Sequence, residues 1–219
     1  MAAEEPRPEL PFRRALVLAP HTDDGEFGCG GTIARLVDEG REVWYVAFSA
    51  AEKSVPKEFE DDVLRTEVRE ATAVLGIAPE RLHIGRFEVR DFPAQRQALL
   101  DEMIRLREAL RPDVVFLPSQ FDIHQDHATV HAEGLRAFKG ATMLGYEVPW
   151  NNLVFETTAF VRLADRHLDR KIAALSRYRS QAHRPYANEE SLRAQARMRG
   201  TQAGCRWAET FQVIRWIAG

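Results

Sequence analysis

The sequence predicts an α/β protein in which helices cover both faces of a mostly parallel sheet. Two observations carry this prediction. Short apolar runs alternate with amphipathic helical patterns through the first half of the chain, and a helix that crosses between two buried strands makes those strands parallel. The length of 219 residues suits one such domain. We therefore expect a flexible, acidic and proline-rich tail over residues 1–12 and a single three-layer, Rossmann-like domain over residues 13–219.

The first half of the chain has the clearest alternation. Four apolar runs predict strands, at residues 15–19, 42–49, 81–87 and 113–119. Three segments between them carry apolar residues at helical spacing, at residues 31–40, 58–76 and 93–111. Glycine ends the first two helices, and proline falls in the first turn of the third. This order, β-α-β-α-β-α-β, favours a parallel arrangement of the four strands.

The second half is less regular. Helical patterns are predicted at residues 125–138, 167–181 and 189–200. Further strands are predicted at residues 141–150, 155–163 and 208–217. Six arginines in and between the last two helices could meet a phosphate, but a solvated helical face is the favoured interpretation: Arg177, Arg179, Arg184, Arg193, Arg197 and Arg199. No repeat and no biased linker marks a second domain.

Composition narrows the class of partner. The formal net charge is -3, so bulk electrostatics does not draw the chain toward nucleic acid. No apolar run reaches the roughly 18 residues of a membrane span, and the N-terminus lacks the basic-then-apolar order of a signal peptide. The two cysteines, Cys29 and Cys205, make no disulfide framework. We expect a cytoplasmic protein without a membrane span and without a nucleic-acid partner.

Polar side chains gather after two of the predicted strands. The segment APHTDDGEFGCGG (residues 19–31) follows the first strand, and SQFDIHQDHATVH (residues 119–131) follows the fourth. The carboxyl ends of parallel strands meet at one edge of the sheet, and open α/β sheets bind their ligands there. We therefore expect histidines and carboxylates from these two distant segments to converge.

A glycine-rich turn after a strand suggests a nucleotide loop, but the neighbouring residues argue against one. A dinucleotide fingerprint needs a glycine where Ile33 stands, and it needs an acidic residue near residues 47–50, which have none. A P-loop needs a lysine where Thr32 follows the glycines. We expect the glycines to permit a tight turn and close packing of a helix against the sheet.

A metal site fits the two clusters better. His21, Asp24 and His127 would supply two imidazoles and one carboxylate, a ligand set typical of catalytic zinc with an open position for water. Asp23 would lie beside that water and accept its proton. His124 lies three residues before His127, so one histidine would bind metal while the other faces the substrate.

These residues also have plainer interpretations. Asp126 or Asp122 would hold an imidazole in one tautomer, yet the second cluster alone also suits a solvated turn before a helix. Asp23 and Asp24 alone suit a helix N-cap and first turn. Cys29 suits a small packing residue. For Cys29 the packing role is the favoured interpretation, whereas the placement of both clusters at strand ends favours the metal site for the histidines and carboxylates.

Two motifs, HTDD (residues 21–24) with the glycines that follow and HQDH (residues 124–127), resemble those of the PIG-L/LmbE-like family of zinc-dependent N-acetylglucosaminyl de-N-acetylases. The family's motifs are His-Pro-Asp-Asp-Glu followed by glycines, and His-x-Asp-His. Family-like order extends to REATAVLG, RPDVVFLPS and GCRWAETF, at residues 69–76, 111–119 and 204–211. Thr22 and Gln125 replace common prolines, and Glu26 stands one place later than the usual acid.

The resemblance implies a role for each matching residue. The zinc ligands would be His21, Asp24 and His127. Asp23 would be the general base. His124 would stabilise the oxyanion or protonate the leaving amine.

The resemblance also implies three supporting residues. Asp126 would orient His124. Asp91 resembles a position that contacts sugar hydroxyls, and Arg65 resembles a helix arginine that contacts substrate, although it stands two residues before Glu67 rather than three. Ile123 stands where some members carry an arginine, so that substrate contact is not expected here.

The function implied is metal-dependent hydrolysis of the N-acetyl group of an amino sugar of the GlcNAc type, free or conjugated, giving acetate and a free amine. The cofactor would be Zn²⁺, with other divalent metals as alternatives, and the family suggests a homo-oligomer, a trimer or hexamer. Two alternatives stay open. Two histidines and a carboxylate also form the facial triad of non-haem Fe(II) oxygenases, and such a site would also suit a module that binds a sugar nucleotide without chemistry.

Overall fold

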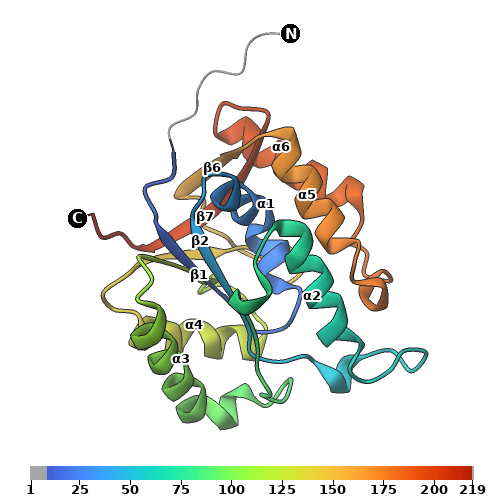
Figure 1. Cartoon of the computed structure of the whole chain (residues 1–219). Coiled ribbons are helices and arrows are strands. Elements are labelled where there is room, and N and C mark those ends of the chain that lie inside the picture. Colours follow the sequence, from blue (N-terminus) through green and yellow to red (C-terminus); the bar gives the residue numbers. More distant parts are fainter. Residues whose placement is uncertain (1–8, 219) are drawn as a thin grey trace.

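The computed structural model describes residues 9–218, so most of the tail predicted over residues 1–12 lies outside the described residues. The described part forms one seven-stranded sheet of order β3-β2-β1-β4-β5-β7-β6 (Figure 1). Strands β1 to β5 are mutually parallel, and β7 runs antiparallel to both of its neighbours. The predicted α/β class with a mostly parallel sheet is confirmed.

The elements follow the predicted order. The strands are β1 (Arg14–Ala19), β2 (Glu42–Ala47), β3 (Leu82–Ile84), β4 (Val114–Pro118), β5 (Thr142–Tyr146), β6 (Ala159–Leu163) and β7 (Trp207–Arg215). The helices are α1 (Asp24–Asp38), α2 (Val63–Leu75), α3 (Arg96–Leu110), α4 (Gln125–Ala137), α5 (Asp165–Leu175) and α6 (Glu189–Gln202). Short 3₁₀ turns are η1 (Glu52–Ser54), η2 (Pro79–Arg81), η3 (Phe92–Gln95) and η4 (Arg179–Gln181). Most elements are shorter than predicted, because apolar periodicity continues into the flanking turns.

Helices cover both faces of the sheet, which gives the three layers (Figure 1). Alternate residues of β1 point to opposite sides, as a strand requires. Val17 joins the apolar cluster under α1, α2, α5 and α6, whereas Leu16 and Leu18 join the cluster under α3 and α4. Both clusters are buried, so β1 sits at the centre of the core. No helix among residues 9–218 is long and apolar enough to cross a membrane.

Helix α1 begins at Asp24, seven residues earlier than predicted. The glycine-rich stretch is therefore helical, and the tight turn expected there is wrong. Close packing is the reason for the glycines: a Cβ at Gly28 would collide with the ring of Tyr146, and one at Gly25 would lie 2.5 Å from Tyr45. The glycines let the first turns of α1 lie directly against the sheet.

Helix α1 is kinked at Cys29, whose backbone (φ -145°, ψ 22°) is not helical. A straight helix would bond the Gly31 N–H to the Phe27 carbonyl. Here Gly31 N–H donates instead to the Glu209 carboxylate at 2.9 Å, and the Phe27 carbonyl accepts from Lys171 Nζ at 2.7 Å. Lys171 and Glu209 also contact each other at 2.6 Å. This buried ion pair replaces the backbone bond that the kink removes.

Replacing Glu209 with alanine is expected to destabilise the protein by about 3–5 kcal/mol. The change leaves the buried Lys171 ammonium and the N–H groups of Gly31 and Thr32 without that acceptor. Chemical denaturation followed by circular dichroism measures the free energy of unfolding. The control is Glu58→Ala, at an exposed carboxylate, which should cost less than about 0.5 kcal/mol. Equal stability of the two variants would refute the role given to Glu209.

Candidate metal centre

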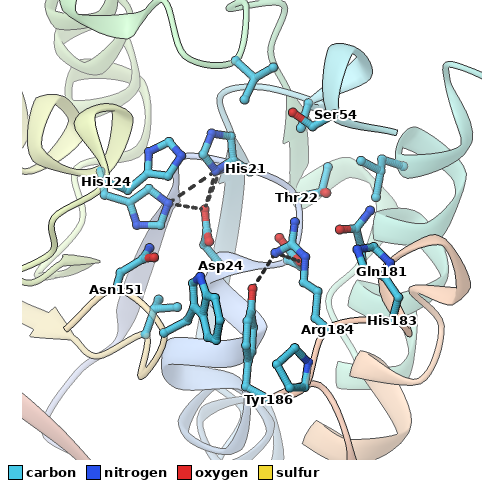
Figure 2. A pocket seen from close by; sticks show the side chains of 18 residues that line it. His21, Thr22, Asp24, Ser54, His124, Asn151, Gln181, His183, Arg184 and Tyr186 are labelled. Atoms are coloured by element: carbon cyan, nitrogen blue, oxygen red, sulfur yellow. Dashed lines mark hydrogen bonds and ion pairs between the residues drawn. The ribbon is translucent and has the colours of Figure 1, made fainter. Parts of the chain in front are cut away.

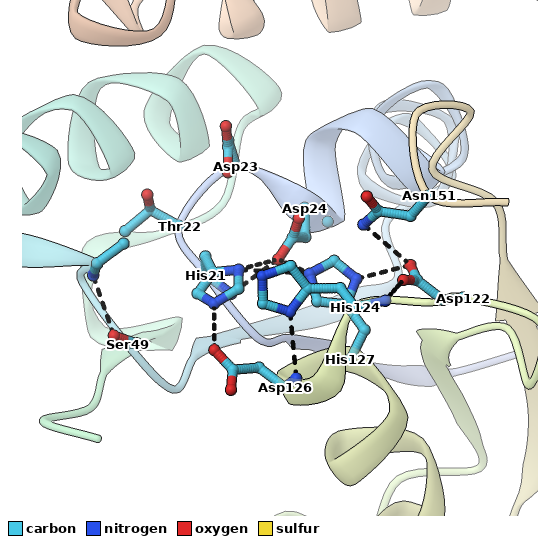
Figure 3. A network of polar contacts seen from close by, with 12 residues as sticks. His21, Thr22, Asp23, Asp24, Ser49, Asp122, His124, Asp126, His127 and Asn151 are labelled. Carbon is cyan, nitrogen blue, oxygen red and sulfur yellow. Dashed lines mark hydrogen bonds and ion pairs between the residues drawn. The ribbon is translucent and has the colours of Figure 1, made fainter. Parts of the chain in front are cut away.

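The two polar clusters meet because their strands are neighbours. Strands β1 and β4 pair in parallel, with Val17 opposite Phe116, so both chains leave the sheet at the same edge. The segment after β1 turns at once into α1, and the segment after β4 leads into α4. Figure 3 shows the histidines of both segments side by side beyond the strand ends. The predicted convergence is confirmed.

Three ligand atoms converge on one point. Asp24 Oδ2 lies 3.1 Å from His21 Nδ1 and 3.1 Å from His127 Nε2, and the two ring nitrogens are 3.3 Å apart. In a tetrahedral site with ligands about 2.0–2.1 Å from zinc, neighbouring ligand atoms are about 3.3 Å apart. All three side chains are buried. The spacing of the three atoms therefore fits one face of such a site.

Carboxylates behind the histidines assign their tautomers. Asp126 Oδ2 lies 2.9 Å from His21 Nε2, and Asp122 Oδ2 lies 2.7 Å from His127 Nδ1. An ionised carboxylate only accepts, so each of these ring nitrogens carries the hydrogen. The opposite nitrogens, His21 Nδ1 and His127 Nε2, then turn lone pairs toward Asp24. Three acceptors facing one another repel unless a cation lies among them.

The electrostatics of the ligands point the same way. Burial raises the pKa of Asp24, but His127 and His21 outweigh it and hold that pKa well below its usual range. Burial lowers the pKa of His127, but Asp24 and Asp122 together raise it to about 10. The surroundings thus favour positive charge at this point, which a bound metal ion would supply in place of protons.

The partner of Asp126 differs from the prediction. Its carboxylate faces His21 rather than His124, and only its backbone N–H donates to His124, at 3.1 Å to Nδ1. The expected role of orienting His124 by the carboxylate is therefore wrong. Two backbone N–H groups, of Arg90 and Phe92, donate to the same carboxylate at 2.6 and 3.4 Å. Asp126 is a positioning residue for His21.

His124 presents a donor to the cavity. Its Nδ1 accepts the Asp126 N–H, so the hydrogen of the neutral ring sits on Nε2. Burial, followed by the neighbouring His127 and His21, lowers the pKa of His124 and favours this neutral form. The ligand nitrogens of His21, His124 and His127 lie within 4.8 Å of one another and form a second group that could hold a metal ion. The tautomer of His124 favours hydrogen bonding to a substrate oxygen over ligation.

Asp23 occupies the N-cap position of α1, yet its side chain makes no capping hydrogen bond. The plainer interpretation of Asp23 and Asp24 as N-cap and first-turn residues is therefore right about their positions, but the Asp23 side chain does not cap the helix. Burial raises the pKa of Asp23, while Arg184, 3.4 Å away at Nη1, opposes the rise. Asp23 lines the cavity beside His21 and Asp24. A carboxylate that is buried, uncapped and beside the ligands can accept a proton there.

Two tyrosines lie beneath the loop between β1 and α1 and hold it in place through hydrogen bonds. The hydroxyls of Tyr45 and Tyr178 lie 2.8 and 2.7 Å from the Thr22 carbonyl oxygen, and both also contact the Glu26 carboxyl group. Glu26 is fully buried, and burial raises its pKa to about 8 against the opposing tyrosine hydrogen bonds. Glu26 stands one place later in the motif than the usual acid. Its side chain contacts the two tyrosines beneath the loop that carries Asp23 and does not line the cavity.

The two predicted substrate residues lie outside the cavity. Asp91 is exposed and accepts from Gln95 Nε2 at 2.8 Å. Arg65 binds Glu52 at 2.9 Å and the Gly85 carbonyl at 3.2 Å. Neither side chain is among those lining the cavity, so the geometry does not support the predicted sugar contacts. The segment around Asp91 contributes backbone N–H groups that hold Asp126.

The site opens into a cavity of about 400 Å³ (Figure 2). Drug-sized ligands typically occupy cavities of about 300–1,000 Å³. The outer wall comes from the loop after β5, from η4 and from the loop between η4 and α6. The residues concerned are Trp150, Asn151, Gln181, His183, Arg184, Pro185 and Tyr186. Of these, the sequence singled out only Arg184, as one of the arginines that could meet a phosphate. The favoured interpretation was a solvated helical face, whereas Arg184 lines the cavity.

Replacing Asp122 with asparagine is expected to weaken metal affinity about 10- to 100-fold. The amide accepts the His127 Nδ1 hydrogen less strongly than the carboxylate does, so the imidazole becomes a poorer and less fixed ligand. Competition against a chelator of known affinity measures the change. Asp101→Asn, on the exposed face of α3, is the matched control. Unchanged affinity in the Asp122 variant would mean that this carboxylate does not serve a metal ligand.

Known proteins resemble this chain in sequence. A sequence profile of the family described as PIG-L, GlcNAc-PI de-N-acetylase, matches residues 16–138, more than half of the chain. An uncharacterised deacetylase of Escherichia coli K12, YaiS, is 28% identical over 177 residues, 75% of this chain and 90% of the relative. Diacetylchitobiose deacetylase of Thermococcus kodakarensis is 26% identical over 133 residues, 57% of this chain and 49% of the relative.

Solved structures extend the comparison to nearly the whole chain. N,N'-diacetylchitobiose deacetylase of Pyrococcus horikoshii superposes with a TM-score of 0.79 at 22% identity, over 93% of this chain and 84% of that one. The conserved protein TT1542 of Thermus thermophilus has a TM-score of 0.77 at 30% identity, over 94% and 96% of the two chains. At 22% identity, the likeness to the Pyrococcus horikoshii structure shows the fold alone. Because the profile match spans both polar clusters, the chain belongs to the PIG-L family of de-N-acetylases.

Proposed function

We propose that this protein removes the acetyl group from an N-acetylated amino sugar of the GlcNAc type, using a divalent metal ion, Zn²⁺ in the first instance. The observation that carries the proposal is the convergence of three ligand atoms, from His21, Asp24 and His127, beside the uncapped carboxylate of Asp23. Membership of a de-N-acetylase family supports the same reaction. Similarity to diacetylchitobiose deacetylase supports an amino-sugar substrate.

In this reaction the metal ion, Asp23 and the carboxylates behind the histidines have separate roles. A bound zinc ion would lower the pKa of a water molecule to about 7 and polarise the amide carbonyl. Asp23 accepts the proton of the attacking water, and its burial among apolar and cationic neighbours keeps it close to the reacting atoms. Asp126 and Asp122 keep the ligand lone pairs of His21 and His127 turned inward throughout.

His124 acts on the substrate oxygen and the leaving group. Its Nε2–H donates to the amide oxygen as negative charge develops there. Asp23, protonated in the first step, then delivers a proton to the departing nitrogen, either directly or with His124. Removal of one donor of this kind typically costs about 100- to 1,000-fold in rate. The products are acetate and a free amine.

The test is release of free amine from a panel of N-acetylated amino sugars by the zinc-loaded protein, with and without chelator. We expect amine and acetate in equal amounts, lost on chelation and restored by zinc. Oxygen consumption with an Fe(II)-loaded sample, in place of amine release, would favour the oxygenase alternative. Sugar binding without turnover by any metal form would favour the binding module. Either result would overturn the proposal.

A further inference from the structure

The outer wall of the cavity carries cationic and polar groups that the reaction does not use. Gln181, His183, Arg184 and Tyr186 lie on it, across the cavity from the histidine cluster (Figure 2). The acetyl group must lie at the histidine cluster during hydrolysis. The remainder of the substrate then extends toward this wall, so its side chains select what the substrate carries.

Arg184 is the charged group of this wall, and most of its donors are unused. One nitrogen, Nη1, lies 3.4 Å from Asp23 Oδ2 and donates to Tyr186 Oη at 2.8 Å. Across residues 9–218, Nε and Nη2 of Arg184 contact no acceptor. Its side chain is 31% exposed and lines the cavity. The guanidinium therefore has an open edge at the cavity.

Arg199 shows how this fold satisfies an arginine whose role is structural. Its Nε and Nη2 bind both oxygens of Glu147, at 2.9 and 2.7 Å, in a paired contact. Such two-pronged contacts are the preferred geometry of arginine with a carboxylate. Arg184 has no such contact with Asp23, which it touches through one nitrogen at long range. The Nε and Nη2 donors of Arg184 therefore remain available to bind both oxygens of another oxyanion.

We propose that Arg184 binds an anionic group of the substrate, a phosphate or a carboxylate, so that the protein acts on acidic N-acetyl amino sugars in preference to neutral ones. This rests on the proposed function, because it assigns the acetyl group to the opposite end of the same cavity. Tyr186 holds the guanidinium in place through its hydroxyl. A planar guanidinium binds a phosphate and a carboxylate through the same pair of N–H donors, so these two anionic groups are tested separately.

The experiment compares kcat/KM for three anionic substrates, N-acetylglucosamine 1-phosphate, N-acetylglucosamine 6-phosphate and N-acetylmuramic acid, with that for neutral methyl N-acetylglucosaminide. The variants are Arg184→Met, which removes the charge, and Arg184→Lys, which keeps the charge without the fork. Arg179→Met is the matched control, since Arg179 is exposed, contacts Glu70 and does not line the cavity. Because Arg184 also touches Asp23, the ratio of anionic to neutral kcat/KM is the quantity compared.

We expect the wild type to prefer at least one anionic substrate by about 10- to 100-fold, the gain of a charge-assisted paired contact. Arg184→Met should abolish the preference, Arg184→Lys should retain part of it, and Arg179→Met should keep it. The preferred substrate identifies phosphate or carboxylate. An equal preference in wild type and Arg184→Met, or no preference at all, would overturn the assignment.

A second measurement separates this proposal from the proposed function. Glucosamine 1-phosphate, glucosamine 6-phosphate, muramic acid and methyl glucosaminide correspond to the deacetylated products and carry no acetyl group to lose, so calorimetry on the zinc-loaded protein measures their affinities directly. Tighter binding of at least one anionic ligand by wild type than by Arg184→Met would support the anion site even if no sugar were deacetylated. Equal binding of every anionic ligand by both proteins would overturn the anion site even if deacetylation were observed.

Discussion

Replacement of Asp23 with asparagine is expected to lower kcat by about 10²- to 10⁴-fold, the usual contribution of a positioned general base. The amide cannot accept the water proton, while its shape keeps the loop intact. Asp23 lies outside the converging ligand atoms of Asp24 and the two histidines. The metal content of the variant should therefore stay at the wild-type level. Steady-state amine release and elemental analysis of the same preparation measure the two quantities.

The matched control for this variant is Asp91→Asn. Asp91 is an exposed carboxylate whose side chain lies outside the cavity, although it lies next to backbone groups that hold Asp126. We expect its kcat to change by less than about threefold, in line with ordinary surface substitutions. A similar loss in both variants, or full activity of Asp23→Asn, would show that Asp23 is not the base.

Replacement of His127 with alanine is expected to remove both metal and activity. The change deletes one of three converging ligand atoms and leaves Asp122 without its imidazole partner. A bound metal would supply several kcal/mol of transition-state stabilisation, so kcat/KM should fall by more than about 1,000-fold, to the level of chelated wild type. Elemental analysis and amine release measure the two losses, and circular dichroism reports whether the fold persists.

The control for His127 is His83→Ala, at an exposed histidine on β3 that contacts Glu102 at 3.4 Å. That variant should retain its metal and its activity. A His127→Ala protein that is folded and still holds one metal ion would show that the ion binds elsewhere.

The position of the site could be predicted from the sequence because it depends on topology. Parallel neighbouring strands place their carboxyl ends at one edge, so the segments after β1 and β4 had to meet. Residue type then limits the chemistry. Histidine and aspartate are residue types that bind zinc. His21, Asp24 and His127 could therefore be named as candidate ligands without any knowledge of distances. The same reasoning predicted that a carboxylate would hold an imidazole, which Asp122 does for His127.

Contacts that depend on long-range packing could not be predicted in the same way. Asp126 is adjacent to His127 in sequence, yet its carboxylate reaches back to His21. The helical glycines of α1 depend on the rings of Tyr45 and Tyr146, and the kink at Cys29 depends on Glu209 and Lys171, from far along the chain. Local pattern contains no information about such partners.

The outer wall illustrates the same limit. Arg184 falls between two predicted helices, and the basic composition there favoured a solvated surface over a phosphate contact, whereas the structure places Arg184 at the cavity, between η4 and α6. Arg65 and Asp91 were chosen by likeness of local sequence alone. Their side chains contact Glu52 and Gln95 and do not line the cavity, although the neighbouring Leu64 and Val89 do.

The most direct test of metal-dependent deacetylation at this site is titration of the metal-free protein with Zn²⁺, following bound metal and amine release in the same samples. We predict that amine release rises in proportion to bound metal and levels off at one ion per chain, and that His127→Ala shows neither response. Undiminished amine release by the metal-free protein would contradict the metal-centred mechanism.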